Sequence, residues 1–136
     1  MKTELQATRD KLNDMSKIVV ASAIEMHRHM GPGLLESIYQ HCMVTELRST
    51  GICVDQLVPV VLHDKSTALD KMFLIDMLVE NEIVLELKAV EGFASVHEAQ
   101  LLSYLRLADK RLRFLINFNV LLLKEGLKRM VTSKKP

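Results

Sequence analysis

Two acids and a lysine lie within a stretch of the chain that is otherwise strongly apolar. Asp76 falls in the apolar run 73–79, and Glu86 and Lys88 fall in the run 83–90. Glu86 and Lys88 are two residues apart, so in a β-strand their side chains share one face. Charged groups are rarely buried without partners, because removing a charge from water is costly. The pattern predicts a pairing network, a bound cation or both, and a divalent metal is the simplest solution.

The turn between the two runs decides whether the acids can meet. In an antiparallel pair, directly opposed residues share a face and their numbers have a constant sum. A three-residue loop at 80–82 places Asp76 opposite Glu86. A two-residue loop at 81–82 places Asp76 opposite Leu87 and sends the carboxylates to different faces. A shared metal site therefore requires the odd-numbered loop.

Length and composition indicate one globular domain. The 136 residues suffice for a single core, and 49% hydrophobic with 26% charged residues argues against disorder. A net charge of +1 gives no overall attraction to nucleic acid or membrane, so such binding would need local patches. We expect a single domain over 1–136, with an N-terminal extension at 1–13 and a basic tail at 132–136.

No segment has the composition of a targeting or membrane-spanning sequence. Residues 1–17 are strongly charged and lack the apolar core of a signal peptide, and no window approaches the length of a membrane span. We therefore expect a cytoplasmic protein with no membrane partner. Cys42 and Cys53 lack CxxC spacing, which predicts buried free thiols in a reducing compartment.

Periodicity predicts two helices and then three strands. Apolar residues recur every three or four positions over 12–30, which is helical spacing, although the helix could begin near Leu5. The Gly-Pro-Gly segment at 31–33 ends that helix, and a second helix follows over 34–49. A strand is predicted at 52–63, where Pro59 indicates an edge or a bulge. The strands at 69–80 and 83–90 are apolar on both faces, so they should be central.

The remaining segment returns the chain to the sheet. Ser95 and Glu98 form a capping box for a helix over 96–108, and strands are predicted at 111–119 and 126–131. A three-strand meander, a crossover helix and a returning strand imply an α/β fold with a mixed β-sheet flanked by helices.

Several fragments in order resemble a known nuclease group. Asp76, a short turn and Glu86-Leu87-Lys88 resemble the motif of the PD-(D/E)xK nuclease superfamily. The segment 33–39 matches the GxxExxY signature of one bacterial and archaeal family within it, and the segments 97–100, 104–105 and 116–118 extend the likeness. The resemblance implies a restriction-endonuclease-like αβββαβ core. Residues 73–75 are more apolar than this family's pattern, which weakens the inference about substrate contacts more than that about metal binding.

The resemblance also implies a site for Mg²⁺ or Mn²⁺. Hard oxygen ligands suit these ions, and the ligands would be the carboxylates of Glu36, Asp76 and Glu86 with the main-chain carbonyl of Leu87. Lys88 would be catalytic, by positioning the attacking water or stabilising charge on the phosphoryl group. Clustered carboxylates repel one another, so the metal would make their shared ionisation tolerable.

Two residues of the crossover helix would complete this catalytic site. Gln100 would orient Lys88 or a phosphate oxygen, and His97 lies one turn earlier, where it could join the same face.

Each of these roles has a structural alternative. A carboxylate in the first helical turn, such as Glu36, is favoured by the helix dipole without any catalytic purpose. Lys88 could merely neutralise the acids. Gln100 could cap a backbone group, His97 could be structural, and Tyr39 could pack with its hydroxyl satisfied at the edge of the site.

Candidate substrate contacts are mostly cations near the end of the crossover helix. Arg106, Lys110, Arg111 and Arg113 could meet a nucleic-acid backbone, although cations are also favoured at any solvated helix C-terminus. Tyr39 and His97 are further candidates for substrate binding.

The sequence thus predicts a metal-dependent nuclease that hydrolyses phosphodiester bonds, with DNA favoured over RNA. The main alternative is a non-catalytic module that keeps the fold and binds nucleic acid or a partner protein. A phosphodiesterase acting on a small nucleotide is a third hypothesis. A chain this small offers little surface to a duplex, so a homodimer or a partner protein could supply more.

Overall fold

The structure is a computed structural model that describes residues 3–91, 99, 103, 106 and 112–131. Its elements are, in chain order, α1 (Glu4–Met30), α2 (Glu36–Ser49), β1 (Val54–Asp64), β2 (Thr67–Val79), β3 (Ile83–Lys88), β4 (Leu112–Asn117), the 3₁₀ helix η1 (Leu123–Glu125) and β5 (Leu127–Val131).

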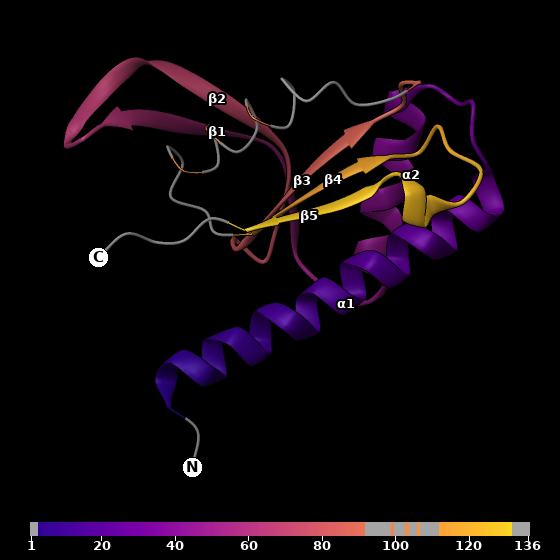
Figure 1. Ribbon diagram of the computed structural model, residues 1–136, viewed down its shortest axis with the longest axis horizontal. Coiled ribbons are helices and arrows are strands. Elements are labelled where there is room, and N and C mark those ends of the chain that lie inside the picture. The colour runs from indigo at the N-terminus through magenta and orange to yellow at the C-terminus, as the bar shows by residue number, and fades with distance from the viewer. Residues whose placement is uncertain (1–2, 92–98, 100–102, 104–105, 107–111, 132–136) are drawn as a thin grey trace.

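The five strands of the described residues form one sheet in the order β1-β2-β3-β4-β5. β3 and β4 run parallel, and the other neighbours run antiparallel. The predicted mixed sheet flanked by helices is therefore confirmed. β1 and β2 continue beyond the rest of the sheet as a long hairpin that curves away from the helices (Figure 1).

α1 and α2 lie on one side of β3, β4 and β5 (Figure 1). The main core joins both helices to alternate residues of the central strands, which are Leu85 and Leu87 in β3 and Phe114 and Ile116 in β4. Because successive side chains of a strand point to opposite faces, Glu86 and Lys88 face away from the helices. In the parallel register Glu86 lies beside Leu115, so β4 presents Arg113 to the same face as Glu86.

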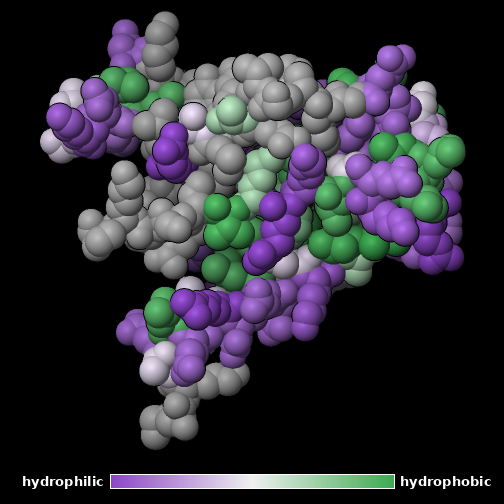
Figure 2. Space-filling model, viewed as in Figure 1, coloured by the Kyte–Doolittle hydropathy of each residue, from purple (hydrophilic) through white to green (hydrophobic). Residues whose placement is uncertain are grey.

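The N-terminal half of α1 projects beyond the sheet (Figure 1). Its first buried residue is Met15, and Figure 2 shows mostly hydrophilic residues over the projecting part. Thr3 and Gln6 form a capping box that begins the helix. The predicted extension at 1–13 is therefore helical from Glu4 onward, and the tail at 132–136 lies outside the described residues.

Most predicted elements are found with shifted ends. Pro59 lies in the edge strand β1, as expected. Of the predicted crossover helix, Ala99, Ser103 and Arg106 are helical and the other positions lie outside the described residues. η1 was not predicted. The cysteines are free as expected, but the prediction of burial is wrong, because Cys53 is exposed and Cys42 is only half-buried.

No helix within the described ranges is both long and apolar enough to cross a membrane.

The loop between β2 and β3 has the odd length that a shared acid site requires. Val79 pairs with Ile83, so residues 80–82 form the three-residue loop. The loop places two non-glycine residues in the left-handed region, Glu80 at φ 50° and Asn81 at φ 58°. Asparagine tolerates this conformation better than glutamate does.

We predict that Glu80→Gly stabilises the protein by about 1 kcal/mol, because glycine adopts positive φ without the steric penalty of a Cβ. Urea denaturation would measure this as a higher midpoint at an unchanged slope. Glu82→Gly is the matched control and should destabilise, since Glu82 does not have positive φ. Equal effects of the two substitutions would contradict the prediction.

Candidate active site

Asp76 and Glu86 lie where β2 and β3 separate. The pairing of these strands runs from Val79 with Ile83 to Met77 with Leu85. Asp76 and Glu86 are the next positions in the same register. There the Leu87 N–H donates to Asp76 Oδ2 at 3.3 Å, so the Asp76 side chain lies against the β3 backbone. The odd loop therefore sets Asp76 opposite Glu86 in the strand register, as predicted, and we call Asp76 and Glu86 the acid pair.

The acid pair has an unusual electrostatic environment. Glu86 is only 4% exposed, and burial raises its pKa to about 8, helped by repulsion from Asp76 and a side-chain hydrogen bond with it. The positive charges of Arg113 and Lys88 act in the opposite direction on this pKa. Within the described part of the chain, Glu86 Oε1 is buried without a hydrogen-bond partner. Glu86 therefore carries a proton at neutral pH unless another cation replaces it.

Arg113 of β4 is a buried cation beside this pair. Its side chain is fully buried, and burial lowers its pKa to about 10 while Glu86 and Asp76 raise it. The guanidinium carbon lies 5.9 Å from the centroid of the Phe73 ring. The expectation that Arg113 belongs to a surface cluster for nucleic acid is therefore wrong, because β4 is a central strand and its position faces the protein interior.

A hydrogen-bond network ties the ends of β3 and β4 together at Lys88. Asn117 Nδ2 donates to the Val90 carbonyl at 2.7 Å, and Asn117 Oδ1 accepts from the Val90 N–H at 3.1 Å. The Phe118 N–H donates to the Lys88 carbonyl at 2.9 Å. His27 Nε2 in turn donates to the Phe118 carbonyl at 3.1 Å. The backbone that carries Lys88 is thus held from two elements.

Sequence reasoning did not assign these supporting roles to Asn117 and His27. The available signal was an amide within the otherwise apolar segment 114–118. Buried polar groups need partners, so such a residue predicts a local hydrogen-bond network.

Comparison with known proteins agrees with this geometry. The family model of the PD-(D/E)XK nuclease superfamily matches residues 13–130. The chain belongs to the PD-(D/E)XK nuclease superfamily. Membership confirms the restriction-endonuclease-like α/β fold, and it indicates nuclease activity and a nucleic-acid substrate. Searches of curated proteins and of solved structures found no match.

In this PD-(D/E)XK protein, Glu36 does not form a three-acid cluster with the acid pair. Among the residues that the structure describes, no three His, Cys, Asp or Glu side chains come close enough to share a metal. Glu36 is half-buried in the first turn of α2, and α2 packs on the sheet face opposite to Glu86. The acid pair is the part of the expected ligand set that the fold assembles.

The acid pair by itself suits the metal that PD-(D/E)XK nucleases typically use. Mg²⁺ is usually held by one or two carboxylates and keeps several waters, so two acids are a sufficient donor set. The unpartnered Glu86 Oε1 is an oxygen available for such an ion. The residues present therefore fit a hard divalent cation.

Tyr39 is a structural residue in this fold. Its side chain is fully buried and stacks on Phe118, with ring centroids 4.7 Å apart. Its hydroxyl donates to the Gly31 carbonyl at 2.5 Å and accepts from the Leu34 N–H at 3.1 Å. The structure thus contradicts the expectation that Tyr39 contacts substrate, because both the ring and the hydroxyl are engaged within the protein.

The other predicted site residues are only partly described. Lys88 is half-buried at the end of β3, and Arg106 is helical and exposed. Four further candidates, His97, Gln100, Lys110 and Arg111, lie outside the described residues.

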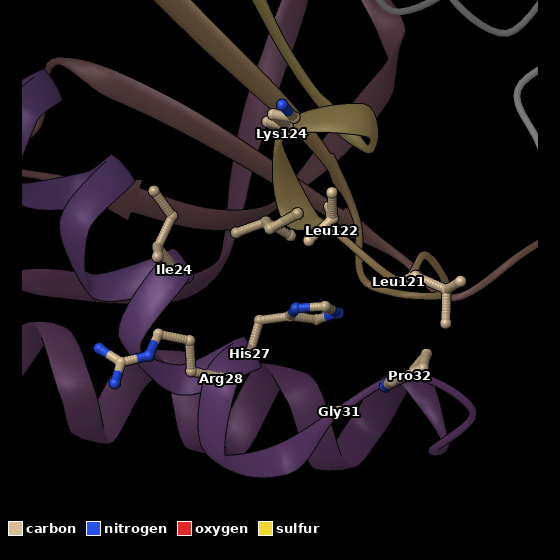
Figure 3. A pocket seen from close by; sticks show the side chains of 9 residues that line it. Ile24, His27, Arg28, Gly31, Pro32, Leu121, Leu122 and Lys124 are labelled. Atoms are coloured by element: carbon tan, nitrogen blue, oxygen red, sulfur yellow. The ribbon is translucent and has the colours of Figure 1, made fainter.

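A pocket of about 530 Å³ lies elsewhere, between the end of α1 and η1 (Figure 3). Its lining is mostly apolar, with Ile24, Pro32 and residues 121–123, and Arg28 and Lys124 supply the charges. It contains no carboxylate, and its His27 ring already bonds Phe118. We therefore place the chemistry at the acid pair.

We predict that the metal-free protein loses stability relative to Glu86→Gln as the pH rises from about 5 to 9. A carboxyl whose folded pKa is raised from 4.5 to about 8 stabilises the fold fully below pH 4.5, and this contribution is lost as the pH passes through 8. The difference should be on the order of a few kcal/mol.

Denaturation midpoints of both proteins in EDTA at several pH values would measure this difference. Glu82→Gln, which changes an exposed acid in the β2–β3 loop, should follow the native pH dependence. Parallel curves for the native protein and Glu86→Gln would contradict the raised pKa.

Proposed function

We propose that this protein is a metal-dependent nuclease that hydrolyses phosphodiester bonds, with DNA favoured over RNA as substrate. The observation that carries the proposal is the acid pair with Lys88 on the same sheet face, in a chain of the PD-(D/E)XK superfamily. The segment 33–39 supports a finer assignment to the GxxExxY family.

Asp76 and Glu86 would hold Mg²⁺ or Mn²⁺ together with the Leu87 carbonyl. When bound, the ion would polarise the scissile phosphate and lower the pKa of a coordinated water. Metal binding requires ionised carboxylates, so it would release the proton that Glu86 holds in the metal-free protein.

Lys88 would act on the reacting groups. It shares a strand face with Glu86, and its charge reaches the acid pair, where it lowers the pKa of Glu86. It is half-buried, so it can touch a substrate, in contrast to the fully buried Arg113. We assign Lys88 the role of orienting the attacking water or stabilising negative charge on the phosphoryl group.

The remaining candidates complete the proposal. Gln100 would orient Lys88, and His97 would join that face. Arg106, Lys110 and Arg111 would meet the phosphate backbone, whose affinity would then fall with rising salt. A homodimer or a partner protein would extend the surface that a duplex needs.

We predict that the native chain cleaves labelled DNA in the presence of Mg²⁺ or Mn²⁺, and that Asp76→Asn and Lys88→Ala each slow cleavage at least about a hundredfold, as loss of a charge-stabilising group does elsewhere. The assay compares single- and double-stranded DNA and RNA and a cyclic nucleotide, with EDTA as the metal-free condition.

Two exposed positions provide matched controls. Asp70→Asn in β2 and Lys17→Ala in α1 change the same residue types away from the site and should leave cleavage unchanged. Absence of cleavage together with no metal-induced rise in melting temperature would favour the binding module. Preferential turnover of the cyclic nucleotide would favour the small-molecule phosphodiesterase.

A further inference from the structure

We propose that Asn117 is a positioning residue for Lys88, because its side-chain amide replaces a peptide group and ties down the chain that follows the lysine. The inference deepens the proposed function of the same site, and its catalytic consequence rests on that function. Its structural part can be tested without any activity.

The sheet register places Asn117 beside Lys88. The two residues are the last pair of the parallel ladder between β3 and β4. Ile116 and Phe118 belong to the main core against the helices, so Asn117 points to the other face of the sheet. Lys88 points to that same face, because directly paired residues share a face. Asn117 is only 2% exposed, so a polar side chain is buried directly beside the lysine that we assign to the reaction.

The regular hydrogen bonds between β3 and β4 end at this pair. The Phe118 N–H donates to the Lys88 carbonyl at 2.9 Å, which fits a parallel ladder. In the same register, the next bonds would join the Val90 N–H to the Phe118 carbonyl and the Val90 carbonyl to the Val120 N–H. The Phe118 carbonyl instead accepts from His27 Nε2 of α1 at 3.1 Å. Val90 therefore needs other partners.

The Asn117 side chain supplies both of these partners. Its Oδ1 accepts from the Val90 N–H at 3.1 Å, and its Nδ2 donates to the Val90 carbonyl at 2.7 Å. A carboxamide has the donor and the acceptor of a peptide group, so it can replace one in a ladder. Oδ1 also accepts from the Asn119 N–H at 3.1 Å. The pairing of the two strands thus reaches Val90, although the Phe118 carbonyl has turned to α1.

This arrangement fixes the backbone from which the Lys88 side chain extends. Lys88 is the last residue of β3, and strand ends open easily when few bonds hold them. Here the Lys88 carbonyl and both polar groups of Val90 are bonded. Catalytic groups need such support, since a displacement of about 1 Å can cost about a hundredfold in rate. Both polar atoms of the Asn117 side chain are occupied, so Asn117 acts through Lys88 and not on substrate.

The first test uses NMR on Asn117→Leu without metal or substrate. Leucine keeps the volume of asparagine and removes both polar atoms. We expect the Val90 amide to exchange its hydrogen at least about tenfold faster, because it loses its acceptor. Backbone order parameters of residues 88–90 should fall from about 0.85 toward about 0.6. Native exchange at Val90 or native order at Lys88 would overturn the proposal.

Two further variants separate the hydrogen bonds from the packing. Asn117→Asp keeps an acceptor for the Val90 N–H, so this amide should exchange more slowly than in Asn117→Leu. Asn119→Leu makes the same change two residues away and keeps its main-chain N–H, so residues 88–90 should remain as in the native chain. If Asn117→Leu does not fold, Asn117→Asp takes its place, because it loses the donor to the Val90 carbonyl. Native order at residues 88–90 in that variant would contradict the proposal.

The second test is kinetic and applies to a cleaving protein. Asn117→Leu should lower kcat at least about tenfold and leave KM for DNA unchanged, because Asn117 touches no substrate. In the Lys88→Ala background the same substitution should cost less than about twofold, since no lysine is left to position. Equal losses in both backgrounds, or a rise in KM without a change in kcat, would reduce Asn117 to a structural residue. Where Lys88→Ala cleaves too slowly to measure, the split between kcat and KM decides.

The two tests distinguish this proposal from the nuclease assignment. Loss of order at residues 88–90 in a protein that cleaves none of the substrates would refute the nuclease alone. Native order at these residues in a cleaving Asn117→Leu variant would refute the positioning role alone.

Discussion

Repulsion between the buried carboxylate of Glu86 and the half-buried carboxylate of Asp76 is the constraint on which this site depends. Asp76 and Glu86 meet at the end of a strand pair, and Glu86 is almost fully buried. Such a pair is stable only if a proton, an internal cation or a metal compensates the charge. The raised pKa of Glu86 supplies the first, and the positive charges of Arg113 and Lys88 act on the same carboxyl. The same arrangement leaves an unpartnered carboxylate oxygen for the third.

The scaffold makes this costly arrangement possible. β3 is bordered by β2 and β4, and its helix-facing residues are all part of the main core. Burial of that face stabilises the strand, so its other face can carry charged groups. The bonds of Asn117 and Phe118 keep β3 and β4 together past the point where β2 leaves. Binding sites in α/β folds are commonly formed where neighbouring strands separate in this way.

The pocket beside η1 shows that a cavity alone does not identify a catalytic site. Its volume is about 530 Å³, yet no acidic residue lines it. Its histidine, His27, already forms a hydrogen bond with the Phe118 carbonyl. The acid pair concentrates perturbed ionisable groups, which is a property common to catalytic sites. The candidate site is therefore marked by its buried ionisable groups and not by the volume of a cavity.

Sequence reasoning predicted much of this fold because its signals are local. Strand alternation predicted that Glu86 and Lys88 share a face, and parity of the loop length gave the condition under which Asp76 joins them. Apolar runs on both faces predicted that β3 is central. These inferences need only the two-residue repeat of a strand and the free-energy cost of burying a charge. Both can be applied directly to the order of the residues.

Other predictions failed because they depended on which side of the sheet an element packs. Helical spacing placed Glu36 in a first turn but could not tell that α2 covers the face opposite to Glu86. Tyr39 was also a candidate for substrate contact, although its ring is buried against Phe118. The sequence placed Arg113 among several surface cations. In the structure it belongs to β4, an internal strand of the sheet, and its side chain is buried.

By itself, the sequence determined the type of the main helices and strands, the shared strand face of Glu86 and Lys88, and the choice between an odd and an even loop. Only the tertiary structure decided that the loop is odd, that Arg113 crosses β3 toward Phe73, and that Asn117 and His27 support Lys88. The physical reason is that periodicity is a property of neighbouring residues, whereas the compensation of a buried charge depends on groups that are distant in the chain. Arg113 and Glu86 come to lie on the same face of the sheet only when β4 returns to lie parallel to β3.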